Sequence, residues 1–136
     1  MNEILEKLKL SLKELEEKHG GIFLFSLFLR EDALGRWDLL VSAPWLNSSS
    51  LDSYEIVAKT VQLSLSESEV IQIARVVILD TTDVAVVFLQ DLYSVPNGSF
   101  VEVQNCEPLT SRFGFTIKRA YVLRCVKSTR SASTNS

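Results

Sequence analysis

The sequence has few of the residues that build cross-linked or metal-bound proteins. Its 136 residues include two cysteines, one histidine, five glycines and three prolines. Cys106 and Cys125 are too few for a disulfide framework, and we expect two separate, mostly buried thiols. One histidine and two scattered cysteines do not supply a zinc site by themselves. We therefore predict a chain with no metal site and no cofactor.

Long apolar runs and a strong charge bias are also missing. The longest apolar run, Ile22 to Leu29, is interrupted by Ser26 and is far shorter than the ~20 residues of a membrane helix. The N-terminal residues alternate acidic and apolar side chains, unlike a secretory signal. We therefore expect a cytoplasmic protein with no membrane partner. The net charge of −3 argues against nucleic acid, whose binders usually show a basic face.

The chain does have enough apolar residues for one core. Hydrophobic residues make up 46% and charged residues 23%, both close to the averages for globular proteins. The length is that of an ordinary single domain. We expect one domain over residues 1–126. Residues 127–136 are polar with no apolar face, so we expect a disordered tail there.

Hydrophobic spacing predicts the elements of the first half. Residues 3–19 read as an amphipathic helix with one leucine face, formed by Leu5, Leu8, Leu12 and Leu15. Residues 21–29 are apolar at odd and even positions, which predicts a central strand. Residues 37–43 predict an antiparallel neighbour, because the connection is too short for a crossover helix.

The middle of the chain predicts a helix followed by a third strand. The serine cluster at 47–50 is a helix cap, and Tyr54, Val57, Ala58, Val61 and Leu65 then repeat at helical spacing. Ser66 and Glu69 form a second capping box, which predicts a short helix or turn. Residues 75–79 are largely β-branched and predict the third strand.

Residues 82–95 allow two interpretations. In one, residues 80–83 are a hairpin turn and residues 84–89 a strand. In the other, which we favour, Thr82 caps a helix whose face consists of Val84, Val87, Phe88, Leu92 and Val95. Residues 100–106 and 115–126 then predict a final hairpin with a longer loop. The predicted fold is of the α/β or α+β class, with a mixed sheet of about five strands and covering helices.

This topology predicts a ligand site at one edge of the sheet. If the second and third strands are parallel, their C-terminal ends lie together, where open sheets often bind ligands. Trp45 could stack on a ring there, and the backbone N–H groups near Thr82 could bind an anion. The same composition also suits a helix cap and a hydrophobic lid. The candidate residues are Ser42, Trp45, Asp80, Thr81, Thr82 and Asp83.

A second candidate site lies on the first two strands. Leu24-Phe25-Ser26, followed by Gly-Arg-Trp-Asp-Leu-Leu-Val at 35–41, resembles the core of minimal nucleotidyltransferases over about 18 residues. In that family a Gly-Ser pair grips phosphate, and the two aspartates of Asp-x-Asp-Leu-Leu-Val hold metal ions. The resemblance implies that Asp38 is the second aspartate and that Ser26 stands near the serine.

The chain departs from this family pattern at two positions. Arg36 replaces the first aspartate, and no glycine precedes a serine at the end of the first strand. A guanidinium cannot bind Mg²⁺, which prefers carboxylate oxygens. The resemblance therefore favours a relative that keeps the fold over an active enzyme.

Since no catalytic set is complete, the sequence favours a non-catalytic interaction or regulatory domain. Its partner would be another protein or a second copy of the chain, and a mean hydropathy of +0.16 leaves apolar surface for such a contact. Two alternatives remain open. One is a domain that binds a small molecule at the predicted sheet edge, and the other is an enzyme of the degenerate nucleotidyltransferase type.

Overall fold

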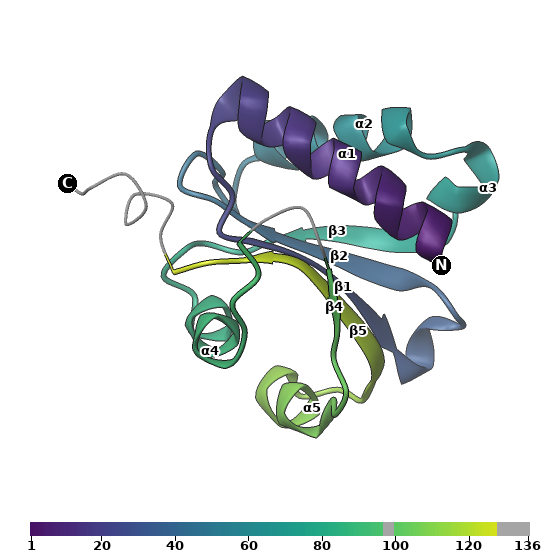
Figure 1. Ribbon diagram of the computed structural model, residues 1–136, viewed down its shortest axis with the longest axis vertical. Coiled ribbons are helices and arrows are strands. Elements are labelled where there is room, and N and C mark those ends of the chain that lie inside the picture. Colours follow the sequence, from purple (N-terminus) through teal and green to yellow (C-terminus); the bar gives the residue numbers. More distant parts are fainter. Residues whose placement is uncertain (97–99, 128–136) are drawn as a thin grey trace.

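The computed structural model describes residues 1–96 and 100–127, and it has three layers built around one mixed sheet (Figure 1). The tail predicted for 127–136 lies outside the described residues, apart from Lys127. Helices α1, α2 and α3 lie on one face of the sheet, and α4 and α5 lie on the other. The elements are α1 (Asn2–His19), β1 (Leu24–Arg30), the 3-10 helix Glu31–Ala33, β2 (Trp37–Ser42), α2 (Leu51–Ser64), α3 (Glu67–Val70), β3 (Ile73–Ile78), α4 (Val84–Leu92), β4 (Val101–Glu102), α5 (Glu107–Phe113) and β5 (Ile117–Cys125).

The sheet has the strand order β3-β2-β1-β5-β4. Strand β1 is antiparallel to β2, and β2 is parallel to β3, so both predicted pairings are confirmed. The central strand is confirmed as well, because residues 24–28 are all buried. Five strands with helices on both faces confirm the predicted mixed fold. Strands β3 and β4 form the two edges.

The predicted leucine face of α1 is confirmed. Leu5, Leu8, Leu12 and Leu15 are each at most 3% exposed and pack with α2 against the sheet. The predicted caps are also present, since the Ser50 hydroxyl accepts a hydrogen bond from the Ser53 N–H at the start of α2. A second apolar cluster fills the space between the sheet and α4 and α5.

The helix predicted within 82–95 is confirmed as α4, but of the predicted face within this helix only Phe88 packs on the core. The buried residues are Ala85, Val86 and Leu89, whereas Val84, Val87 and Leu92 are 69%, 45% and 46% exposed. Asp83 caps the helix in place of Thr82. Nearly every position of α4 is apolar, so the pattern does not select a face. Val95 leaves the helix and pairs with Cys125 of β5.

The predicted final hairpin is only partly correct. Strand β4 has two residues and pairs with β5, and the residues expected to form the loop make helix α5. Two signals explain this helix. Pro108 lies in its first turn, where its missing N–H costs nothing, and Gly114 ends it with a φ of 81°.

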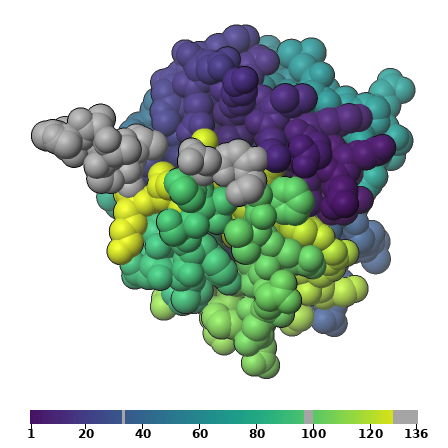
Figure 2. Space-filling model, viewed as in Figure 1, coloured from purple at the N-terminus to yellow at the C-terminus, as the bar shows by residue number. Residues whose placement is uncertain are grey.

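The space-filling view shows α1 across the top of the molecule and α4 and α5 below it (Figure 2). It looks onto the β4 side, and β3 lies at the far side of the sheet. Within the described residues, no helix has both the length and the apolar character needed to cross a membrane.

Candidate functional site

The ends of β2 and β3 meet at the edge where the sequence predicts a ligand. The Asp80 carboxylate accepts hydrogen bonds from the Ser48 N–H at 3.2 Å and the Ser48 hydroxyl at 2.9 Å. The Asp83 carboxylate accepts one from the Ala85 N–H at 2.8 Å and so caps α4. Asp80 therefore joins the loop that follows β3 to the loop that precedes α2, and Asp83 caps a helix. Ser42 is fully buried, and Thr81 and Thr82 lie in the turn before α4.

Trp45 contacts the C-terminal end of α1. Its indole N–H donates to the carbonyls of Gly20 at 2.9 Å and Gly21 at 3.0 Å, and its ring stacks on His19 with 4.7 Å between centroids. Gly20 has a φ of 125°, which disfavours any side chain there. Among the described residues, no hydrogen bond joins Trp45 to residues 80–83. Trp45, Asp80 and Asp83 therefore have structural roles, whereas the Ser42 hydroxyl has no hydrogen-bond partner among the described residues. A ligand at this edge stays a prediction.

Asp38, the aspartate of the nucleotidyltransferase resemblance, is held by two arginines. Its side chain is 2% exposed, and one carboxylate oxygen lies 2.8 Å from Arg30 Nε and 3.2 Å from an Arg75 nitrogen. Arg30 comes from the end of β1 and Arg75 from β3, so the carboxylate joins three neighbouring strands. Its other oxygen has no hydrogen-bond partner in the described part of the chain.

This donor set does not fit a divalent cation. Two guanidinium groups lie where a metal ion would need further oxygen ligands, and they repel a cation. Arg36, at the position of the family's first aspartate, donates from Nε to the Ile71 carbonyl at 2.9 Å. Ser26 is fully buried on the same face as Asp38, and its hydroxyl has no hydrogen-bond partner among the described residues. Among those residues, no group of three or more His, Cys, Asp and Glu could hold a metal ion.

A cavity of about 320 Å³ beside α1 is lined by Leu10, Leu12 and five charged residues, of which Lys9 and Glu6 form an ion pair at 3.3 Å. Glu16 accepts a hydrogen bond from Arg124 at 2.6 Å through one oxygen and from the Ile22 N–H at 2.9 Å through the other. These bonds fix α1 to the ends of β1 and β5. Together with the Lys9–Glu6 pair, they account for four of the five charged residues at this cavity, the fifth being Lys13.

The outer side of β3 has unused backbone hydrogen-bonding groups. The Leu79 N–H donates to the Val41 carbonyl at 2.9 Å, which fixes the alternation of the parallel ladder. Residues 75, 77 and 79 therefore direct their backbone groups toward β2, and Val76 and Ile78 direct theirs outward. In the part of the chain that the structure describes, no strand pairs with this side of β3.

A narrow groove runs along this edge, between β3 and α2. Its cavity of about 80 Å³ is lined by residues from α2, α3 and β3, among them Tyr54, Ala58, Gln62, Val70 and Val76. Tyr54, Ala58 and Gln62 are spaced four residues apart and so form one stripe along α2. Tyr54 is 42% exposed at this surface. An extended segment that pairs with β3 would place alternate side chains toward the groove.

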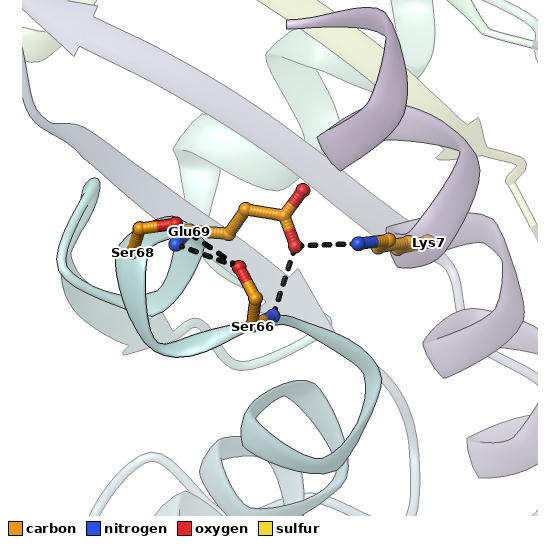
Figure 3. Close-up of polar contacts among 4 residues, drawn as sticks. All are labelled: Lys7, Ser66, Ser68 and Glu69. Carbon is orange, nitrogen blue, oxygen red and sulfur yellow. Dashed lines mark hydrogen bonds and ion pairs between the residues drawn. The ribbon is translucent and has the colours of Figure 1, made fainter.

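Helix α3, at one end of the groove, is fixed to α1 by Glu69 (Figure 3). Its carboxylate accepts hydrogen bonds from Lys7 Nζ at 2.8 Å and from the Ser66 N–H at 2.9 Å. Its own N–H donates to the Ser66 hydroxyl, which completes the predicted capping box. The hydrogen bond from Lys7, followed by that from the Ser66 backbone, lowers the pKa of Glu69 below its ordinary value.

The apolar residues on the outer side of α4 form a second exposed surface, which we call the α4 stripe. It consists of Val84, Val87 and Leu92. The helix satisfies its own backbone groups there, so a partner would gain only side-chain contacts. Strand β3 offers backbone hydrogen bonds as well, and this difference makes it the stronger candidate.

The chain matches no known protein-family profile, no curated protein and no solved structure. Sequence reasoning predicted β3 as a strand but did not predict that it would lie at an open edge. The one available signal was weak. Only one charged residue, Arg75, interrupts the apolar run from Ile73 to Leu79.

Proposed function

We propose that this chain is a non-catalytic interaction domain that binds an extended protein segment along the outer side of β3. The observation that carries the proposal is the row of outward-directed backbone groups at Val76 and Ile78 beside an apolar groove. A strand added to a sheet edge gains affinity from main-chain hydrogen bonds and specificity from its alternate side chains.

The two edges of the sheet differ in a way that supports this proposal. Exposed edges invite unwanted pairing, and proteins commonly protect them by shortness, proline, charge or a covering element. The opposite edge, β4, has only two residues. Strand β3 has six residues and no proline, and both its charged residue, Arg75, and its register shift against β2 lie before Val76. An edge strand without such protection from Val76 onward is typical of a strand that has a partner.

The non-catalytic part of the proposal rests on the carboxylates. Asp38 is held by arginines, Asp80 by Ser48, and Asp83 caps a helix. A general acid or base needs access to substrate, and these groups are already hydrogen-bonded within the chain. We place the domain in the cytoplasm on the sequence argument given above.

Val76→Pro tests the proposal. Proline removes the outward N–H and leaves the ladder to β2 intact, because residues 75, 77 and 79 make that ladder. Val76→Thr is the matched control, since it keeps the N–H and a β-branched side chain. We expect partners captured by the wild-type chain to bind the proline variant at least ~10-fold more weakly, through a lost hydrogen bond and the clash of the ring.

The measurement is affinity capture from cells that contain the natural protein, followed by titration of each captured protein against the three chains. Circular dichroism and the thermal midpoint first establish that Val76→Pro folds. Equal binding by the proline and wild-type chains would contradict the proposal. Turnover of nucleoside triphosphate by the purified chain, abolished in Asp38→Asn, would contradict its non-catalytic part.

A further inference from the structure

We infer that the strand which pairs with β3 is the β3 of a second copy, in antiparallel register about a twofold axis at Val76. The inference rests on the proposed function and names the partner of that surface. Two sheets of five strands would become one continuous sheet of ten.

The backbone of β3 suits this symmetry. Val76 directs both its N–H and its carbonyl outward, as the ladder to β2 requires. In an antiparallel pair, two residues that face each other this way exchange both hydrogen bonds. A twofold axis through Val76 therefore satisfies the outward N–H and carbonyl of Val76 in both copies.

The side chains disfavour a register centred on Arg75. Two residues that face each other in an antiparallel pair have their side chains on the same face of the sheet. Because side chains alternate along a strand, a twofold axis between two copies of β3 must pass through a residue and not between two residues. An axis at Arg75 would place two guanidinium groups opposite each other, which is destabilising. An axis at Val76 places valine opposite valine and Arg75 opposite the partner's Val77. Of these two registers, only the one at Val76 opposes no like charges.

Helix α2 extends the contact beyond the strand. Its 14 residues span about 21 Å, close to the length of about 20 Å for the six residues of β3, and the two elements line the groove together. Ala58 lies in the middle of the stripe that borders the groove, and its small side chain permits close approach of the partner's α2. A short strand pair alone is marginally stable in water, and this second layer supplies further apolar burial.

The charges of α2 also suit a second copy. Glu55 and Lys59 are both exposed and follow each other by one helical turn. A twofold axis makes the two α2 helices antiparallel, so the order of Glu55 and Lys59 is reversed between the two copies. The acidic residue of one helix then lies at the same end as the basic residue of the other.

Disulfide trapping tests the register. In a Cys106→Ser background, Val76→Cys should form a covalent dimer under mild oxidation, because two residues paired at the axis lie about 5.5 Å apart between Cα atoms. Val77→Cys is the control. In this register position 77 of one copy lies opposite position 75 of the other, so the two substituted positions are beyond the reach of a disulfide. Cys125 is fully buried and burial raises its pKa to about 11, so it stays unreactive.

Light scattering over a dilution series tests the interface in the full chain. Wild type, Val76→Thr and a variant of the α4 stripe, Val87→Asp, should show twice the monomer mass at high concentration. Val76→Pro should remain monomeric. Loss of the dimer in Val87→Asp but not in Val76→Pro would overturn the inference, as would trapping of Val77→Cys in place of Val76→Cys.

The two proposals can fail separately. A wild-type chain that stays monomeric while Val76→Pro still loses a captured protein overturns the second copy and supports the interaction edge. If Val76→Pro changes neither the mass nor the capture, both proposals are overturned.

Discussion

Asp38 is a carboxylate at a buried strand position, and its arginine partners determine the effect of replacing it. Arg30 is 21% exposed and Arg75 is 52% exposed, so water relieves part of the repulsion that the loss of the charge would leave. Removing one partner of a fully buried ion pair costs roughly 3–5 kcal/mol. We therefore expect Asp38→Asn to lower the free energy of unfolding by about 2–3 kcal/mol.

Asp32→Asn is the control for this prediction, because Asp32 binds the same Arg30 from a side chain that is 70% exposed. An exposed ion pair contributes about 1 kcal/mol at most. Urea denaturation of the three chains measures the difference. Equal losses in Asp38→Asn and Asp32→Asn would show that the buried cluster contributes no more than a surface pair.

At the scale of elements, Glu69 makes the attachment of α3 to α1 sensitive to pH. The pKa of Glu69 is lowered from an ordinary value of 4.5, so the folded state favours its charged form. This contribution to stability is fully present above pH 4.5 and is lost as the pH falls through the folded-state pKa. Glu69→Gln keeps the capping geometry without the charge. We expect wild type to be more stable than Glu69→Gln at neutral pH, and the gap to close in acid.

The measurement is the urea midpoint of both chains from neutral pH down to about pH 3. Glu67→Gln serves as control, since Glu67 lies exposed in the same helix. If the difference in urea midpoint between wild type and Glu69→Gln stays constant over this range, the charge of Glu69 does not contribute to stability and the prediction is wrong.

Several elements could be predicted because short-range physics fixes them. The leucine spacing of α1 and the short turn between β1 and β2 leave one interpretation each. The buried face of α4 could not be predicted, because apolar residues occur on all sides of the helix and no polar side marks the surface that faces solvent. Helix α5 was missed although Pro108 and Gly114 mark its ends.

For the molecule as a whole, the parallel pairing of β2 and β3 followed from the long connection between them, but the open edge did not. Its position depends on β5, which returns from the end of the chain to pair with β1 and leaves β3 outermost. The pairing of β5 with β1 depends on packing between residues that are far apart in the sequence. The predicted ligand residues follow β2 and β3, as expected from the sequence. The contacts of Trp45 with Gly20 and of Asp80 with Ser48 could not be predicted, because these partners are distant in the sequence.

Amide hydrogen exchange of β3, followed residue by residue at rising protein concentration, measures directly whether a second copy covers this edge. The outward N–H groups of Val76 and Ile78 should exchange fast in dilute solution and slow down as the concentration rises. The inward N–H groups of Val77 and Leu79 should be protected throughout. Exchange at Val76 that is equally fast at every concentration would contradict pairing of β3 with a second copy.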